Sequence, residues 1–241
     1  MIIMYHEHMT RKEFCSMVDH AILRQCNPKE KLDEACDLVV KYGFGSLCCF
    51  PADVKYAKQR MGDGGECCAV VGYPMGQNTT ETKVFEALQC IDDGAKELDF
   101  VMNLSKFIDG DDEFVLNELK TCVNAVKAKD PSVIVKIIIE VYWLDKEEDL
   151  RRACELVIAS GADYVKQATG YAPDPYHNTC GLENMAKLRE ICGDRIKLKS
   201  AGVPDDLAQC VQMYKEYDID KFGGIFVDWL EEAGDKFWED K

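Results

Sequence analysis

The sequence predicts an α/β fold in which one parallel sheet closes on itself. The chain has 241 residues and a hydrophobic content of 47%, which suits one large domain, since barrels commonly run about 200 to 250 residues as a single unit. Apolar runs of strand length alternate with helical patterns, the order that builds parallel sheets. Eight such units follow one another along the chain. We therefore expect a single TIM (β/α)8 barrel domain over residues 1–241.

The expected elements follow from apolar runs and from the residues that punctuate them. Asn27-Pro28 and Thr80 are typical of helix starts, while Tyr42-Gly43 and Ser160-Gly161 are typical of helix ends. The expected strands lie near residues 17–21, 45–50, 67–72, 97–102, 133–141, 163–166, 195–199 and 221–227. The expected helices lie near residues 28–42, 51–61, 79–93, 111–129, 145–160, 180–192 and 204–217. The loops between them are short, so no linker divides the chain.

Residues 1–11 are expected to form a flexible N-terminal tail. Its apolar stretch is too short for a signal peptide, and no later run approaches the roughly 20 apolar residues of a membrane span. His6 and His8 lie in this tail, and adventitious metal binding there is the alternative to a purely flexible segment. Because no Cys-x-x-Cys pair or Cys/His cluster has zinc-ligand spacing, we expect neither a metal site nor a cofactor.

The net charge limits which binding partners are expected, and the cysteine content indicates the cellular compartment. The formal net charge is -15, with 29 Lys and Arg against 44 Asp and Glu, so nucleic acid and anionic membrane surfaces are not expected partners. The 13 cysteines are odd in number and dispersed, which does not resemble a disulfide framework. The sequence thus favours a soluble protein of the reducing cytoplasm.

Titratable groups terminate or interrupt three of the apolar strands. Asp99, Lys166 and Lys199 lie in Glu97–Val101, Asp163–Gln167 and Arg195–Ser200, and the catalytic groups of such barrels lie at the C-terminal ends of strands. A lysine in an apolar strand must lose its charge or find a partner. A second ammonium nearby favours the neutral amine, which is the nucleophile that attacks a carbonyl to form a Schiff base. For each residue alone, a solvated loop position or a helix cap is the structural alternative.

At these residues the chain resembles the deoxyribose-phosphate aldolase family, which consists of class I aldolases on a TIM barrel. The resemblance spans roughly residues 17–226, and ordered motifs carry it. By that resemblance Lys166 forms the Schiff base, Lys199 lowers its pKa and Asp99 takes part in proton relay. The motifs are Val18-Asp19-His20, Cys48-Cys49-Phe50-Pro51, residues 71–76, residues 79–87, residues 97–103, Ile138-Ile139-Glu140, residues 161–166, Ala168-Thr169-Gly170 and Lys199-Ser200-Ala201-Gly202.

Two further strand lysines compete with these assignments. Lys197 shares a face with Lys199 because strands have a period of two, but only Lys199 directly precedes the small-residue turn of the family. Lys136 lies in another apolar strand and shares a face with Glu140 by parity. We therefore interpret Lys136 and Glu140 as a structural ion pair.

This chain departs from the family at the residues that would bind the phosphate group of the substrate. The resemblance implies substrate binding by Cys48, Thr169, Gly170, Gly202, Gly223 and Gly224. The second glycine of the turn is replaced by Val203, followed by Pro204, which has no N–H to donate. Ile225 stands where a phosphate-binding serine is expected, and Ala21 replaces a threonine. If phosphate binding is retained, we expect Gly223, Gly224 or Lys221 to compensate for the lost donor groups.

These observations leave three interpretations of function. The favoured one is a working aldolase that reversibly cleaves 2-deoxy-D-ribose 5-phosphate to D-glyceraldehyde 3-phosphate and acetaldehyde. The alternatives are a catalytically weak relative that binds a sugar or a protein, and an aldolase for an acceptor without phosphate. The assembly stays open between a homodimer and a homotetramer.

Overall fold

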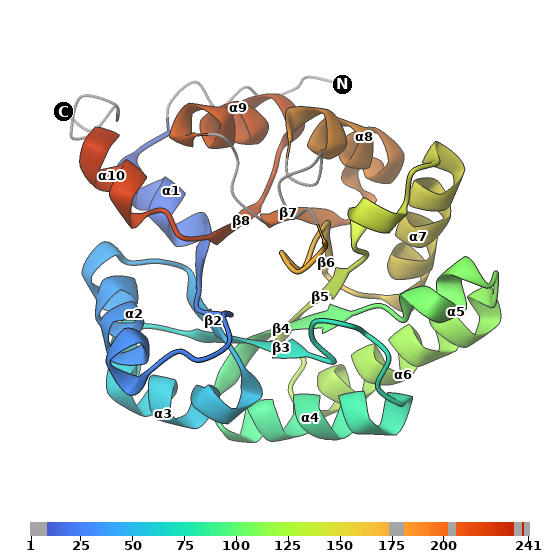
Figure 1. Ribbon diagram of the computed structural model, residues 1–241, viewed down its shortest axis with the longest axis horizontal. Helices are drawn as coiled ribbons and strands as arrows, with labels where there is room; N and C mark the ends of the chain where they lie inside the picture. Colours follow the sequence, from blue (N-terminus) through green and yellow to red (C-terminus); the bar gives the residue numbers. More distant parts are fainter. Residues whose placement is uncertain (1–8, 174–180, 202–205, 234–237, 239–241) are drawn as a thin grey trace.

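The computed structural model describes residues 9–173, 181–201, 206–233 and 238, and it contains the expected closed barrel. The strands pair in parallel in sequence order, and β8 pairs with β1. Figure 1 shows the strands gathered in the centre with the helices around them. The strands are β1 Val18–Ala21, β2 Ser46–Cys49, β3 Cys67–Val71, β4 Ala95–Val101, β5 Ile134–Ile138, β6 Tyr164–Lys166, β7 Lys197–Ala201 and β8 Lys221–Gly224.

The seven expected helices are all present, and the described residues add three short α-helices. The α-helices are α1 Arg11–Met17, α2 Lys29–Tyr42, α3 Pro51–Met61, α4 Thr80–Asp92, α5 Leu104–Ile108, α6 Asp112–Lys129, α7 Glu147–Ser160, α8 Leu182–Cys192, α9 Leu207–Tyr217 and α10 Val227–Ala233. The additions are α1, α5 and α10, each of seven residues or fewer. Such helices are too short for a clear periodic pattern, and local caps define them better.

The start of the folded body illustrates this. Thr10 and Glu13 form a reciprocal capping box at α1, which satisfies backbone N–H groups that a helix start leaves free. Met9 is buried against the hydrophobic core. Residues 9–11 of the expected tail therefore belong to the folded body, while residues 1–8 lie outside the described residues.

The longer helices bury one face against the outside of the barrel. In α7 the buried residues Leu150, Ala153, Cys154 and Val157 recur at the helical period, as expected for an amphipathic helix. Acidic residues occupy its first turn, and Gly161 ends it in the left-handed conformation. None of the described helices is both long and apolar enough to cross a membrane.

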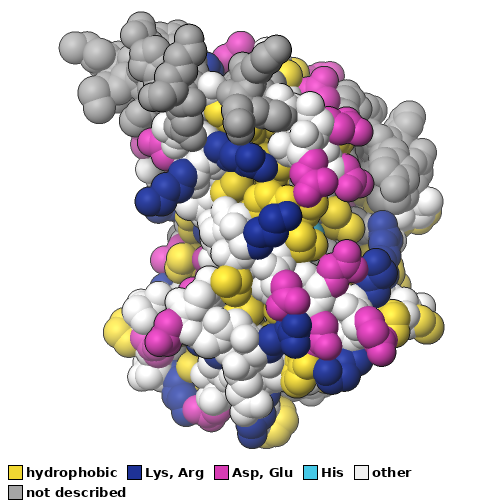
Figure 2. All heavy atoms as spheres, turned by 90° about the vertical axis from the view of Figure 1, so that its left-hand side faces the viewer, with side chains coloured by type: hydrophobic (Ala, Val, Ile, Leu, Met, Phe, Trp, Pro, Cys, Tyr) yellow, Lys and Arg dark blue, Asp and Glu magenta, His cyan; other side chains and the backbone are white. Residues whose placement is uncertain are grey.

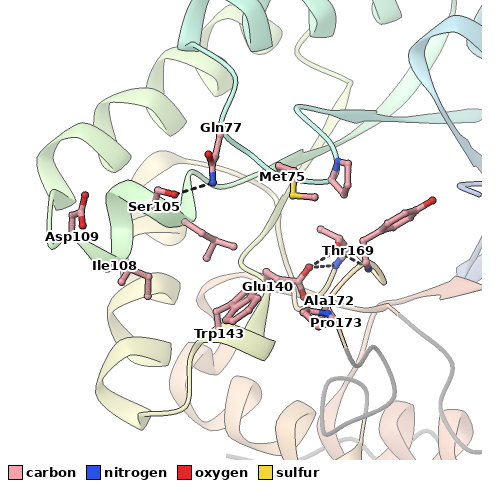
Figure 3. Close-up of a pocket in the computed structure, with 13 residues that line it drawn as sticks. Met75, Gln77, Ser105, Ile108, Asp109, Glu140, Trp143, Thr169, Ala172 and Pro173 are labelled. Carbon is pink, nitrogen blue, oxygen red and sulfur yellow. Dashed lines mark hydrogen bonds between the residues drawn. The ribbon is translucent and has the colours of Figure 1, made fainter. Parts of the chain in front are cut away.

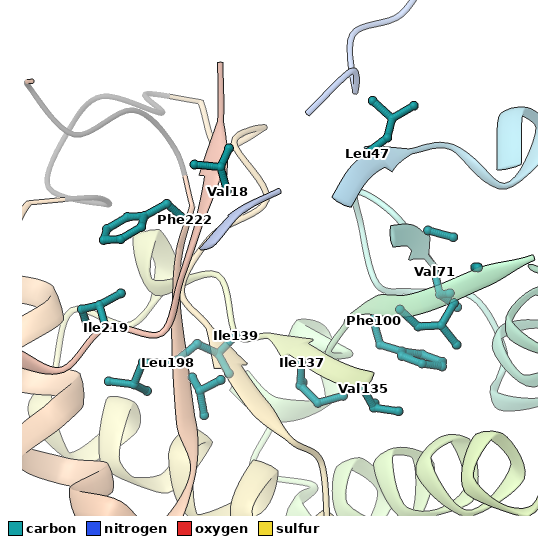
Figure 4. Packing of buried hydrophobic residues seen from close by; sticks show 14 of the residues in the cluster. Val18, Leu47, Val71, Phe100, Val135, Ile137, Ile139, Leu198, Ile219 and Phe222 are labelled. Atoms are coloured by element: carbon teal, nitrogen blue, oxygen red, sulfur yellow. The ribbon is translucent and has the colours of Figure 1, made fainter. Parts of the chain in front are cut away.

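Strand alternation separates an apolar shell from a polar barrel interior. In β5 the side chains of Val135 and Ile137 join the large hydrophobic cluster between strands and helices (Figure 4). Lys136, the residue between them, is fully buried with its ammonium inside the barrel. The period of two therefore directs every second residue of a strand toward the interior, where the candidate site lies.

The outer surface mixes charges of both signs. Figure 2 shows Lys and Arg side chains interspersed with Asp and Glu on the face that carries α2 and α10. Among the ion pairs there, Nζ of Lys29 lies 3.0 Å from Oδ2 of Asp33. Nη2 of Arg60 lies 2.8 Å from Oδ2 of Asp37. Exposed pairs of this kind contribute little to stability, typically below about 1 kcal/mol.

Candidate active site

The barrel brings together the three groups singled out in the sequence. Lys166 ends β6, Lys199 lies within β7 and Asp99 lies in β4. One carboxylate oxygen, Oδ2 of Asp99, accepts hydrogen bonds from Nζ of Lys166 at 2.7 Å and from Nζ of Lys199 at 2.8 Å. Lys166 is 3% exposed and the other two are fully buried. The two amines are register neighbours on adjacent strands, so both reach the same carboxylate.

Four further charged groups extend this arrangement into a buried cluster. Asp19 on β1 accepts from Lys199, and its Oδ1 also accepts from Lys221 at 2.8 Å. Lys221 donates to Glu97 at 2.7 Å. Lys136 lies 2.9 Å from Oδ1 of Asp99, 2.5 Å from Oε2 of Glu97 and 3.4 Å from Oδ2 of Asp19. We call these seven residues, Asp19, Glu97, Asp99, Lys136, Lys166, Lys199 and Lys221, the ionic cluster.

Opposite charges within the ionic cluster hold most of its members ionised. Burial alone raises the pKa of Asp99, but Lys136, Lys166 and Lys199 outweigh it and hold the pKa well below its usual range. The same balance of burial against lysine charge lowers the pKa of Asp19. Burial likewise lowers the pKa of Lys199, and the charges of Asp19 and Asp99 reverse this and raise it well above normal. Asp99 is therefore a carboxylate at neutral pH, and Lys199 is an ammonium.

The expected ion pair between Lys136 and Glu140 is wrong. Lys136 pairs within the ionic cluster, whereas Glu140 accepts hydrogen bonds from the backbone N–H of Thr169 at 3.0 Å and from its hydroxyl. The reason is local. Strand β5 ends at Ile138, and Glu140 adopts a left-handed conformation with φ of 49°. Strand parity no longer fixes the direction of its side chain after that point.

Lys197 and Lys199 share strand parity but differ in environment. Lys197 opens β7, is exposed, and lies over the ring of Tyr164. Lys199 lies two residues nearer the C-terminal end of the barrel, inside the ionic cluster. Position along the strand therefore separates the two lysines.

A cavity of about 270 Å³ opens onto Lys166. Five of the expected substrate-binding residues line it, namely Cys48, Thr169, Gly170, Gly223 and Gly224. The sixth, Gly202, lies outside the described residues, as do Val203 and Pro204. The cavity is also lined by Leu23, Arg24, Tyr73, Tyr171 and Ala201. None of these was predicted to bind substrate, although Tyr73 and Ala201 lie in the family motifs.

The glycine of β8 nearest to Lys199 has a packing role. A Cβ at Gly223 would lie 3.1 Å from Cε of Lys199 and 3.7 Å from Cβ of Ala201. Gly223 also pairs with Asp19 in the sheet. Its lack of a side chain therefore leaves room for the buried ammonium of Lys199. Ile225, which follows the strand, is 60% exposed at the rim of the cavity.

A larger hollow of about 670 Å³ lies on the other side of Thr169 (Figure 3). Gln77 donates to Ser105 at its wall, over 2.9 Å. Glu140 lies at its wall. Burial raises the pKa of Glu140, and the hydrogen bonds from Thr169 oppose that shift. Apolar residues make up much of the lining, including Pro74, Met75, Leu104, Ile108, Trp143, Ala172 and Pro173.

Among the described residues, two groups of potential metal ligands share carboxylates with the ionic cluster. They are Cys48 with Cys68 and Asp99, and Asp19 with Cys68 and Glu97. The ammonium of Lys136 lies 3.3 Å from Sγ of Cys68 and is also paired with Asp99. Because lysine ammonium groups already neutralise these carboxylates, the arrangement suits amine chemistry better than cation binding.

Comparisons with known proteins agree with this geometry. A family model described as DeoC/LacD family aldolase matches residues 6–219. A deoxyribose-phosphate aldolase from Bacillus cytotoxicus is 39% identical over 187 residues, which cover 77% of this chain and 80% of that protein. A solved aldolase structure, QR15, has a TM-score of 0.80 and 32% identity, covering 91% of this chain and 95% of its own. A tetrameric deoxyribose phosphate aldolase from Aeropyrum pernix has the same fold, with a TM-score of 0.81 at 23% identity, and the match covers 93% of this chain and 92% of that one.

Proposed function

Because the chain belongs to the DeoC/LacD aldolase family, we propose that it reversibly cleaves 2-deoxy-D-ribose 5-phosphate to D-glyceraldehyde 3-phosphate and acetaldehyde through a Schiff base on Lys166. The observation that carries this proposal is the shared carboxylate oxygen of Asp99, which holds Lys166 and Lys199 side by side. Lys166 lines the cavity at the C-terminal end of its strand.

The charge count of the ionic cluster supports Lys166 as the nucleophile. It contains three carboxylates and four amines. When Lys136, Lys199 and Lys221 are protonated, they balance Asp19, Glu97 and Asp99. A neutral Lys166 then leaves no unpaired charge in the ionic cluster, and an unpaired buried charge is costly. The amine that faces the cavity is therefore the one that can react without disturbing the others.

The reaction proceeds by covalent catalysis at that amine. Nζ of Lys166 attacks C1 of the open-chain sugar, and the carbonyl oxygen leaves as water. The electron pair of the C2–C3 bond then moves to form an enamine, while the C3 hydroxyl loses its proton and becomes the aldehyde of glyceraldehyde 3-phosphate. Protonation of C2 and addition of water release acetaldehyde and restore the amine.

Asp99 and Lys199 have different roles in proton transfer in this scheme. Asp99 is ionised at neutral pH because the neighbouring lysines, against the effect of burial, hold its pKa low. The low pKa makes Asp99 a weak base, so its main role is to keep both amines in place and to relay protons between them. The Lys199 ammonium is the donor nearest to that carboxylate after Lys166 itself. A positioned acid or base of this kind typically contributes about 10² to 10⁴-fold in rate.

An aldolase for an acceptor without phosphate is the second candidate. Ile225 favours it, because an exposed apolar side chain at the cavity rim offers no hydroxyl to a phosphate. A weak relative retained for binding sugar or protein is disfavoured by the intact pair of amines. Turnover of the phosphorylated and the unphosphorylated sugar distinguishes these candidates.

The direct test is turnover of 2-deoxy-D-ribose 5-phosphate, followed by coupled oxidation of the glyceraldehyde 3-phosphate released. Lys166→Leu should abolish it, because the covalent path needs that amine. Lys197→Leu is the matched control, since Lys197 is an exposed lysine of the neighbouring strand. Activity retained in Lys166→Leu would contradict the proposal.

We further infer a cytoplasmic location and assembly as a homodimer or homotetramer. The twelve described cysteines are all free, which supports a reducing compartment. Exposed large apolar side chains support self-association, among them Phe85 at 72% and Ile108 at 56% exposed. Light scattering of the purified protein measures the assembly, and a strictly monomeric mass would contradict it.

A further inference from the structure

We propose that Arg24, in the segment after β1, binds the phosphate group of the substrate and replaces the phosphate-binding groups that this chain lacks. The proposal rests on the proposed aldolase function, because it assigns the far end of the same cavity. It makes Arg24 a specificity residue for a sugar phosphate. The chemistry recognised is a phosphate monoester dianion, for which a guanidinium is a well-matched partner.

Arg24 lines the cavity that holds Lys166, together with Gly223, Gly224 and Ile225. These last three residues stand at the positions where the family resemblance implies the phosphate end of the substrate. Arg24 is exposed, so its guanidinium meets a ligand that enters from solvent. One cavity therefore has the Schiff-base amine in its buried part and a guanidinium at its open part.

The guanidinium of Arg24 is available for an anion. Among the described residues, no carboxylate lies within ion-pair distance of it, whereas Lys166 and Lys199 in the same cavity are both paired with Asp99. Lys221, the cation that the sequence offered as a compensating group, is also engaged, since it pairs with Asp19 and Glu97. Arg24 is thus the cation of this cavity that a phosphate can bind without breaking an existing ion pair.

Tyr171 holds Arg24 in position. The guanidinium carbon lies 5.7 Å from the centre of the Tyr171 ring, a distance typical of cation–π contacts. The Tyr171 hydroxyl donates to the carbonyl oxygen of Leu23 at 2.6 Å, and its backbone N–H donates to Oγ1 of Thr169 at 3.0 Å. Tyr171 therefore ties the segment that carries Arg24 to the loop that follows Lys166.

A side-chain amide fixes the backbone of the same segment. Nδ2 of Asn27 donates to the carbonyl oxygen of Arg24 at 2.7 Å. The held backbone and the contact with the Tyr171 ring reduce the conformational entropy that ordering a long side chain on a ligand would cost. The position of the cation is thus restricted before substrate binds.

The charges of the lining residues also indicate which of the two hollows beside Thr169 can bind the substrate phosphate. The larger one is lined by Asp109 and Glu140, and its described lining residues include no lysine or arginine (Figure 3). A phosphate dianion would meet carboxylates there. With a net charge of -15 for the whole chain, binding of an anion depends on a local cation, and Arg24 places that cation on the side of Gly223 and Gly224.

The test compares Arg24→Met with Arg24→Lys and with Arg151→Met, which removes an exposed arginine from the outer helix α7. The quantity measured is the ratio of kcat/KM for 2-deoxy-D-ribose 5-phosphate to kcat/KM for 2-deoxy-D-ribose. Arg24→Met should lower this ratio about 10- to 150-fold, the range expected for one charge-assisted hydrogen bond. Arg24→Lys should recover part of it, and Arg151→Met should not change it.

Inorganic phosphate gives a second readout that needs no turnover of sugar. Its dissociation constant, measured by calorimetry, should rise in Arg24→Met by a similar factor and should stay unchanged in Arg151→Met. An unaltered ratio together with unaltered phosphate binding in Arg24→Met would overturn the role of Arg24 and leave the aldolase function intact. Failure of the aldolase function is instead detected by absent turnover of both sugars in the unmodified protein.

Discussion

At the scale of single residues, buried titratable groups differ in whether they have a partner. Lys199 and Asp99 are buried with several opposite charges around them. His20 is buried on β1, and its Nδ1 has no hydrogen-bond partner among the described residues. Its ring stacks on Phe44 with centroids 5.4 Å apart. Burial therefore penalises the charged form of His20 without compensation from a close ion pair.

This difference predicts a pH-dependent stability that belongs to His20. Burial lowers the pKa of His20 to about 4, against a smaller opposing effect of Glu34. Between that value and the ordinary value near 6.5, the unfolded chain binds more protons than the folded one, so stability is lost as pH falls through this window. The loss is about 3 kcal/mol in the free energy of unfolding, since one pKa unit corresponds to 1.36 kcal/mol.

The measurement is urea unfolding between pH 7 and pH 4. His20→Phe keeps an aromatic ring against Phe44 and removes the titration, so its unfolding free energy should fall less steeply across this window than that of the unmodified protein. Parallel curves for the two proteins would show that His20 does not carry this pH dependence.

At the scale of elements, the loop after β3 depends on a close approach of two backbones. Gly76 has φ of +70°, and a Cβ there would lie 2.2 Å from the carbonyl oxygen of Met102, which follows β4. The backbone N–H of Gly76 donates to the carbonyl oxygen of Gly72 at 2.7 Å. This turn therefore needs both the left-handed conformation and the absence of a side chain.

Two alanine substitutions separate these requirements. Gly76→Ala should destabilise the protein by more than about 2 kcal/mol, because it combines backbone strain with a clash. Gly110→Ala is the matched control, since Gly110 has φ of +80° but no atom lies within 4 Å of the position that its Cβ would take. It should cost only the conformational penalty of roughly 1 to 2 kcal/mol. Equal losses in chemical denaturation would mean that the contact with Met102 does not matter.

Elements that carry their own signals were predictable from the sequence. Helix α7 has an amphipathic pattern, an acidic first turn and a terminal glycine, and its predicted range closely matches the observed one. Helix α5 has five residues, too few for a period to be visible. The end of β5 was predicted too late because the left-handed conformation at Glu140 is not encoded by hydrophobicity. Apolar runs thus locate strands better than they locate strand ends.

At the scale of the whole molecule, closing the barrel is what assembles the ionic cluster. Asp19 on β1 reaches Lys199 on β7 and Lys221 on β8 only because β8 pairs with β1. The sequence indicated that Asp99, Lys166 and Lys199 lie on strands and meet at the same end of the barrel. It did not indicate that Glu97 and Lys221 pair with each other, because their strands are far apart in the chain and meet only across the interior.

The ionic cluster also predicts how Lys199 affects the pH dependence of the reaction. Lys199→Leu removes the ammonium that shares Oδ2 of Asp99 with Lys166, and a neighbouring positive charge is what favours a neutral, reactive amine. Turnover should fall about 10² to 10⁴-fold, and the pH profile of the remaining activity should move upward. A merely destabilised variant would lose activity without that movement.

The control for this variant is Lys197→Leu, at a lysine of the same strand that lies outside the cluster. It should keep near-normal turnover and an unchanged pH profile. The reverse pattern, with Lys197 required and Lys199 dispensable, would show that the wrong lysine of β7 has been assigned.

The most direct test of the Schiff-base mechanism is covalent trapping. The protein is incubated with acetaldehyde, reduced with borohydride and mapped by peptide mass spectrometry. We expect a two-carbon adduct on Lys166, because it is the amine of the ionic cluster that faces the cavity and is not needed to balance the three carboxylates. An adduct on Lys136, Lys197 or Lys199 with Lys166 unmodified would contradict this mechanism.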